Sequence, residues 1–345
     1  MTTSAAAPPS RWLRRFAWLL AALTLLLICS GGMVTSKGVG LAVPDWPTTF
    51  GYNMFLFPVS QWVGGIFFEH THRLIASTVG LLTIALAVWL WRESPRLRLL
   101  GLVALGAVIL QGVLGGLRVT LLKDEIGIFH ACLAQAFFGL LVYIAWSLSR
   151  SPSSGTAQRA AFSRLAMIAT ALIYLQLGLG ATMRHQHRDL SILDFPTAYG
   201  TVLPDVSAAN LAAINQWRDA RALSDVTVGQ IWLQMAHRFG ALLIAANVIS
   251  LWFGVRSRGS EASAGTRALS TWWVLFLFCQ ITLGAWTIWS NKAADIATAH
   301  VAVGATMLAF GVVISARSFE DRPAPARISS ATHRAAIGEG AAVSV

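Results

Sequence analysis

The residues best suited to chemistry are histidines that recur at matching places in the chain. The sequence has eight histidines, and five stand at or just inside one end of an apolar segment: His70, His72, His130, His237 and His300. His72-Arg73 recurs as His237-Arg238, while His130 and His300 each open an apolar segment. Imidazoles that face one another across a helical bundle suit axial ligation of heme iron. Zinc needs three or four ligands, and no Cys or carboxylate recurs at matching positions. The pattern therefore favours two bis-histidine heme sites.

One position distinguishes the two copies. Glu69 stands three residues before His72, whereas Gln234 stands three residues before His237. Residues three apart share a helix face, so Glu69 is expected to point toward the same pocket as His72. An ionisable group there is a functional-site candidate, with a solvated carboxylate just outside the helix as the alternative. We interpret the first half as reactive and the second as a heme holder.

The two arginines next to these histidines have two interpretations. Arg73 and Arg238 can offer planar donors to heme propionates. Alternatively, each guanidinium reaches the membrane interface while its stem stays in the apolar layer. The heme prediction does not depend on either.

The composition predicts helices that cross a membrane. Of 345 residues, 55% are hydrophobic and only 12% are charged, about half the charged fraction of a typical soluble domain. This excludes a soluble globular enzyme, a disordered chain and a coiled coil. Eight apolar windows are long enough to span a bilayer, near residues 16–34, 71–91, 99–120, 128–148, 162–183, 231–254, 269–290 and 295–315. We predict an all-α membrane protein.

The distribution of basic residues predicts the orientation. Sixteen of the 26 Lys and Arg fall in the tails and loops on one side of the windows, with five of the 15 acidic residues. This side is expected to be cytoplasmic and to carry both termini, with the histidines toward the outer side of the cell membrane. The net charge of +11 is spread between apolar runs, which argues against nucleic-acid binding. The first window lacks a cleavage site at its end, so we expect a retained helix after a tail of residues 1–15, and a disordered tail at 319–345.

Internal repetition predicts two halves. Asp-Trp-Pro-Thr-Thr-Phe-Gly at 45–51 recurs as Asp-Phe-Pro-Thr-Ala-Tyr-Gly at 194–200. Gln111 and Gln280 also match, each followed by a Leu-Gly pair. We expect two pseudo-symmetric four-helix bundles over residues 16–150 and 160–316. The second outer loop, about 185–230 with His185 and His187, is the longer one.

With these residues in place, the chain resembles the heme A synthase family of cytochrome oxidase assembly. The resemblance covers approximately residues 12–318, and it rests on Gly-Leu-Ala-Val-Pro-Asp-Trp-Pro at 40–47, the Glu69-x-x-His72-Arg73 signature and the paired histidines. It implies an enzyme that oxidises the C8 methyl of heme O to a formyl group by successive hydroxylations. It also implies a substrate site in the N-terminal bundle and a heme b, for electron transfer, in the C-terminal bundle.

Carried over by position, the resemblance makes Glu69 the essential acidic residue. It makes His72 and His130 the substrate-site histidines, and His237 and His300 the heme b ligands. Many bacterial members carry a cysteine pair in the first outer loop, but residues 37–69 contain none. Cys29, Cys132 and Cys279 all lie in apolar runs, so thiol–disulfide exchange in that loop is excluded.

The sequence leaves two alternatives and several partners open. A non-catalytic di-heme cytochrome b explains four histidines but not the Glu69/Gln234 difference. A transporter predicts polar residues near the midplane, whereas the ionisable groups here cluster at the outer ends. Transfer of an apolar substrate favours contact with the enzyme that makes heme O. The electron acceptor and a homo-oligomer stay open.

Overall fold

Long helices dominate the structure. The computed structural model describes residues 9–149, 160–186, 190–257 and 263–320. Eight helices are long and apolar enough to cross a membrane, which confirms the predicted spans. They are α1 (Arg11–Ser36), α2 (Gly64–Glu93), α3 (Arg98–Leu121), α4 (Asp124–Ser149), α5 (Ala160–His185), α7 (Val228–Ser257), α8 (Ala264–Trp289) and α9 (Ala294–Glu320). The described residues contain no β-strand longer than an isolated bridge.

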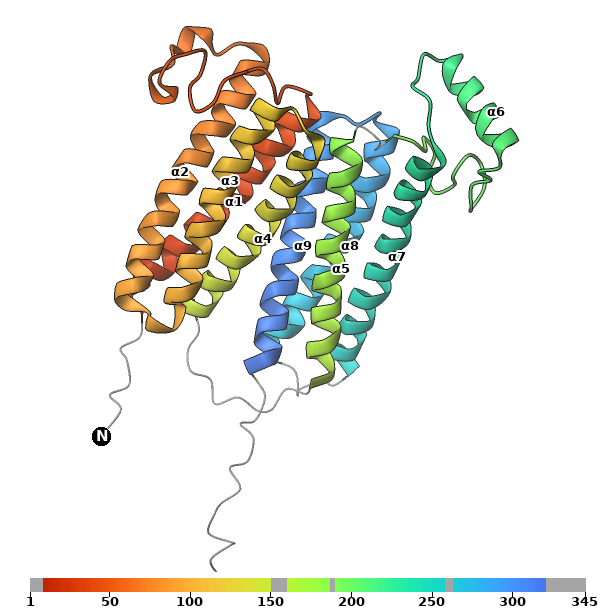
Figure 1. Cartoon of the computed structure of the whole chain (residues 1–345). Helices are drawn as coiled ribbons and strands as arrows, with labels where there is room; N and C mark the ends of the chain where they lie inside the picture. The colour runs from red at the N-terminus through yellow and green to blue at the C-terminus, as the bar shows by residue number, and fades with distance from the viewer. Residues whose placement is uncertain (1–8, 150–159, 187–189, 258–262, 321–345) are drawn as a thin grey trace, which may run out of the picture.

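The helices pack as two groups of four. In the first group, α1 packs on α2, α2 on α3, α3 on α4, and α4 back on α1. In the second, α5, α7, α8 and α9 make the same closed sequence of contacts. The groups meet through α1 with α9, α4 with α5, and α4 with α9, so they lie side by side (Figure 1). Each group is called a bundle below.

Each bundle has an apolar interior of its own. Leu13, Leu86 and Leu141 are fully buried in the first. Trp273 and Leu251 are fully buried in the second. Many other large apolar side chains are exposed, including Leu81 on α2 and Leu242 on α7. A helix in lipid satisfies its own backbone groups, so apolar side chains can cover its outer face without cost.

The loops between helices are unequal at the two ends of the bundles. Both ends of the described chain lie at one end, called the terminal end (Figure 1). The long connections lie at the opposite end, called the loop end. Residues 37–63 form the first cap, which contains short 3₁₀ turns at Met54–Leu56 and Val59–Gln61. Residues 190–227 form the second cap, which contains α6 (Ala208–Asp219).

The repeated motif has the same shape in both caps. Thr49 pairs with Tyr52 and Ala198 pairs with Thr201 as isolated antiparallel bridges. Between them, Phe50 and Gly51 have φ of 51° and 77°, and Tyr199 and Gly200 have φ of 53° and 80°. Two successive positive φ values are typical of the tightest two-residue hairpin turns.

The structure differs from the sequence prediction at several boundaries. α1 begins at Arg11, with the Ser10 hydroxyl accepting the Leu13 N–H at 3.1 Å, so the basic residues predicted to lie in a tail belong to the helix. His185 ends α5 and does not lie in the loop. His187, His333 and nearly all of the predicted disordered tail lie outside the described residues.

The second cap contains a helix that apolar windows cannot reveal. α6 is short and of mixed polarity, and it lies beyond the bundles (Figure 1). Its Ile214 packs with Ile192 and Val226 of the cap and with Ile231 of α7. A search for membrane spans looks for long apolar runs, so this segment was predicted only as loop.

Candidate functional site

Each of the four paired histidines packs its ring against a glycine of the neighbouring helix. A Cβ atom added at the glycine would lie 3.0–3.4 Å from the imidazole Cε1 in every case. The four contacts are Gly31 with His72, Gly115 with His130, Gly180 with His237, and Gly284 with His300. The missing side chain gives each imidazole its space between two helices.

The second pair has the spacing that a shared metal ion requires. The ring centres of His237 and His300 are 6.5 Å apart, and the rings are inclined by 54°. Bonds of roughly 2 Å from a metal to each imidazole nitrogen place two such ring centres about 6 Å apart. His72 and His130 also lie close enough for their charges to interact. In the described residues, no three His, Cys, Asp or Glu side chains gather as metal ligands.

These imidazoles lack the hydrogen bonds expected of structural histidines. The Nδ1 atoms of His72, His130, His237 and His300 are all buried without a hydrogen-bond partner. Leaving a buried polar atom unpaired costs about 1–3 kcal/mol, so four such atoms at matching places need an explanation. Paired imidazoles that are held mainly by packing, with Nδ1 unpartnered in each, fit an iron porphyrin.

Glutamine side chains contact the backbone of two of the histidines and the ring of a third. The Gln111 amide donates to the His130 carbonyl at 3.0 Å, and the Gln176 amide donates to the His237 carbonyl at 2.6 Å. The Gln280 amide nitrogen lies 3.4 Å from the His300 Nε2. Neighbouring helices are therefore tied together at the depth of the imidazoles.

Glu69 holds the first cap onto α2. One carboxylate oxygen accepts the Val43 N–H at 2.9 Å, and the other pairs with the Arg73 guanidinium at 2.8 Å. The Glu69 side chain is buried, with 4% of the residue exposed. Its carboxylate therefore bonds the cap and is not a solvated group outside the helix.

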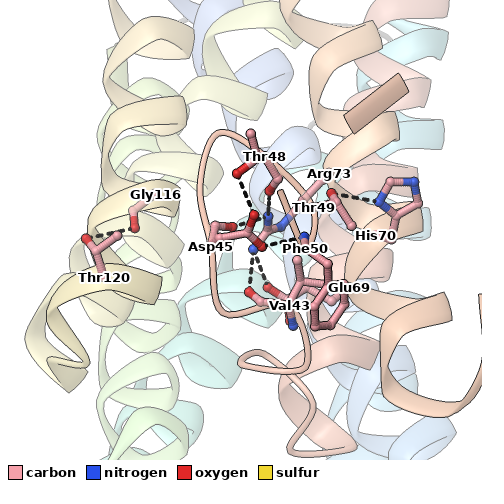
Figure 2. Close-up of polar contacts among 10 residues, drawn as sticks. All are labelled: Val43, Asp45, Thr48, Thr49, Phe50, Glu69, His70, Arg73, Gly116 and Thr120. Carbon is pink, nitrogen blue, oxygen red and sulfur yellow. Dashed lines mark hydrogen bonds and ion pairs between the residues drawn. The ribbon is translucent and has the colours of Figure 1, made fainter. Parts of the chain in front are cut away.

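Arg73 continues the same attachment. Its guanidinium donates to the carbonyl oxygens of Asp45 at 2.7 Å, Thr48 at 3.1 Å and Val43 at 2.8 Å. Figure 2 shows this side chain reaching from α2 into the curve of the cap. Both terminal nitrogens are thus used by the protein itself.

The second bundle makes the corresponding attachment without an ion pair. The Gln234 amide oxygen accepts the Ile192 N–H at 2.7 Å, and the amide nitrogen donates to the Ile192 carbonyl at 3.0 Å. Arg238 donates to the carbonyl oxygens of Asp194 at 2.6 Å and Thr197 at 2.8 Å. The Gln234 amide alone therefore bonds both backbone groups of Ile192. For Val43, Glu69 bonds the N–H and Arg73 bonds the carbonyl.

Asp45 stabilises the positive-φ turn of the first cap. Its carboxylate accepts the Phe50 N–H at 2.8 Å and the Thr48 hydroxyl (Figure 2). It also accepts the Gly51 N–H at 2.9 Å. Burial raises the pKa of the Asp45 carboxyl, but these hydrogen bonds outweigh it and hold the pKa below its usual value. The turn therefore gains stability above about pH 4 and loses it as the pH falls through the lowered pKa.

The structure gives a role to His70, which the histidine pattern left without one, and adds Arg118, which the sequence analysis missed. The buried His70 lies between the rings of Phe57 and Trp62, and its Nδ1 is 3.3 Å from the Thr49 hydroxyl, so it braces the first cap. Arg118, on α3, interacts electrostatically with His72 and His130. Its position one helical turn after Gly115 was the signal that it faces the bundle.

Comparison with known proteins identifies relatives over most of the chain. Residues 57–312 match the family described as cytochrome oxidase assembly protein. A heme A synthase of Rhodopseudomonas palustris is 26% identical over 91% of this chain and 92% of its own length. Heme A synthases of Novosphingobium aromaticivorans and Shouchella clausii are each 26% identical, over 86% and 72% of this chain and 92% and 83% of their own lengths.

The attachment of the first cap to α3 can be tested at Gly116. A Cβ there would lie 2.3 Å from the Trp46 ring. Gly116→Ala should displace the ring and cost about 1–3 kcal/mol of stability, as overpacking does. Gly112→Ala is the matched control, because an added Cβ meets nothing within 4 Å there. Thermal unfolding of both variants in detergent measures the difference, and equal melting temperatures would contradict this account of the cap.

Proposed function

This chain belongs to the cytochrome oxidase assembly protein family, and we propose that it acts as a heme A synthase with one heme site in each bundle. Its relatives across most of their length are heme A synthases, which supports an oxidation of a methyl group of heme O. The observation that carries the proposal is the pair of buried imidazoles in each bundle. The chemistry belongs in the membrane, where heme O, with its apolar tail, is found.

The second bundle is proposed to hold heme b. His237 and His300 have the separation of two axial ligands, and the neighbouring Gln234 is neutral and fully used by the cap. When bound, heme b accepts and passes on single electrons. The protein contributes the ligands and the helix spacing, and it excludes water from the imidazoles by packing.

The first bundle is proposed to bind heme O between His72 and His130. Oxidation of a methyl group releases protons and electrons, so a carboxylate near the porphyrin edge can accept a proton or stabilise developing positive charge. Glu69 is the candidate because it lies on the same helix as His72 and replaces a neutral Gln of the second bundle. Arg73 and Arg238 are assigned to holding the caps.

The orientation follows from charge and from the ends of the chain. Both described ends lie at the terminal end of the bundles (Figure 1), and most of the Lys and Arg fall in the segments that the sequence assigns to that side. We therefore propose that the terminal end faces the cytoplasm and that the heme sites lie toward the outer side.

The direct test of the proposed function is chemical. The full chain is expressed with a source of heme O, and the extracted hemes are separated by chromatography. Heme A and its hydroxylated precursor should form beside heme b. Heme b alone, in both bundles, would support a cytochrome that only carries electrons.

Loss of a ligand in the second bundle should remove its heme. His237→Ala and His300→Ala each delete one axial ligand, so the purified variant should lose the low-spin bis-histidine spectrum and make less heme A. Absorbance spectra of oxidised and reduced protein provide the measurement. Full retention of that spectrum in either variant would disprove the second-bundle assignment.

Loss of a ligand in the first bundle should have a different effect. His72→Ala and His130→Ala should abolish most heme A formation while leaving the second-bundle heme bound, because the two ligand sets are separate. Heme content and product are measured on the same preparations. If either variant loses all heme, one shared site or a misfolded protein explains the histidines better.

Glu69→Gln separates the charge of Glu69 from its structural role. Gln234 shows that an amide can hold a cap through the N–H and the carbonyl of one residue, so the variant should fold and keep its heme b. It should bind heme O yet make little heme A, with hydroxylated heme accumulating if the second oxidation needs the charge more. Glu69→Leu, which loses both cap bonds, is the contrasting variant. A wild-type ratio of heme O, hydroxylated heme and heme A in Glu69→Gln would leave Glu69 as a cap-holding residue only.

A further inference from the structure

Corresponding helices of the two bundles differ at one position beside the histidines. On α3, Gln111, Gly115 and Arg118 lie at spacings of four and three residues and therefore share one helix face. The first two contact the backbone and the ring of His130, so this face looks into the bundle. On α8 the same spacing places Gln280, Gly284 and Thr287 on the face toward His300. The first bundle therefore has a cation where the second has a hydroxyl.

Arg118 is half-buried and directed toward the site. Its guanidinium packs against the first cap, where a Cβ added at Gly40 would lie 2.8 Å from Nη1. It interacts electrostatically with Glu69 and Asp124 as well as with the two histidines. An arginine that only reached for the membrane interface would leave the bundle.

The guanidinium of Arg118 differs from the other arginines at the loop end in having no hydrogen bond assigned within the described residues. Arg73 donates to three carbonyls, Arg238 to the second cap, and Arg218 to Ser224 at 2.6 Å. Arg184 donates to the Gly32 carbonyl at 2.6 Å. No described carboxylate lies within ion-pair distance of Arg118, although Glu69 and Asp124 influence it. Its five donors are available to an anion.

We propose that Arg118 binds a propionate of the substrate porphyrin in the first bundle. Propionates are the anionic groups at the edge of an iron porphyrin, and a guanidinium can hold a carboxylate through two parallel hydrogen bonds. The inference rests on the proposed function, since it assumes a porphyrin between His72 and His130. It assigns to Arg118 the contact that the sequence alone suggested for Arg73.

This contact also restricts which methyl groups can be oxidised. The C8 methyl of heme O shares its pyrrole ring with one propionate. Two axial imidazoles fix the plane of a porphyrin but leave it free to rotate about the axis through the iron. An arginine on a propionate removes that freedom and limits the methyl groups that can reach Glu69.

The experiment compares two porphyrins on the full-length protein in detergent, with the second-bundle heme in place. Iron protoporphyrin IX has both propionates, and its dimethyl ester has none that is charged. Difference absorbance titrations measure the affinity of each for the first bundle, and His72→Ala identifies the signal that belongs there. Wild-type protein should bind the free acid about 10- to 100-fold more tightly than the ester, as expected for one charge-assisted pair.

Arg118→Gln should bind the free acid as weakly as the ester, and Arg118→Lys should fall between. The matched control is Arg98→Gln, which removes the same charge from the terminal end of α3, where Arg98 is half-buried and donates to the Trp91 carbonyl at 2.7 Å. An unchanged second-bundle spectrum shows that each variant is folded. With heme O, Arg118→Gln should also release products oxidised at other methyl groups.

Two results would overturn the inference, and they are distinguishable. If Arg118→Gln keeps the wild-type preference for the free acid, Arg118 does not bind the propionate although the bundle binds a porphyrin. If wild-type protein shows no porphyrin binding that depends on His72, the proposed substrate site fails as well.

Discussion

The contact between an imidazole and a glycine sets the geometry on which the candidate sites depend. A histidine ring does not fit between two closely packed helices unless the facing residue has no side chain, and this occurs at Gly31, Gly115, Gly180 and Gly284. In lipid no water pairs with a buried imidazole, so the ring is held by packing and by the ligand it binds. The same four contacts therefore set both the distance between neighbouring helices and the distance between the two imidazoles of each pair.

The two caps are attached by similar hydrogen bonds, through an ion pair in the first bundle and through a neutral amide in the second. A Gln side chain carries a donor and an acceptor, so Gln234 alone satisfies both backbone groups of Ile192. A carboxylate only accepts, so Glu69 needs the Arg73 guanidinium to bond the Val43 carbonyl. The arginines thus have a structural use in both bundles, and the first bundle can carry a carboxylate beside His72 without leaving a buried charge unpaired.

The eight spans and the family could be predicted from the sequence because both leave signals in residue type and spacing. The length of an apolar run is set by the bilayer, and the confirmed helices extend the predicted windows at nearly every end. The short helix α6 and the bonds of Arg73 could not be predicted in this way. They depend on which backbone groups of a folded cap lack partners, and hydropathy does not report that. The interaction of Arg118 with His72 could not be predicted either, because it joins segments that are distant in the chain.

The link between the bundles at Arg184 bears on the history of the chain. This side chain extends from α5 to the end of α1 and donates to the Gly32 carbonyl and the Ser36 hydroxyl. The place that corresponds to Arg184 in α1 is Thr35, whose hydroxyl bonds within its own helix. In a dimer of identical halves, an arginine at this place would occur in both copies and meet its own image across the symmetry axis. Joining the halves into one polypeptide removes that constraint, so a residue can change in one half and be kept in the other. The differences at Glu69, Arg118 and Arg184 are of the kind that a dimer of identical halves cannot acquire.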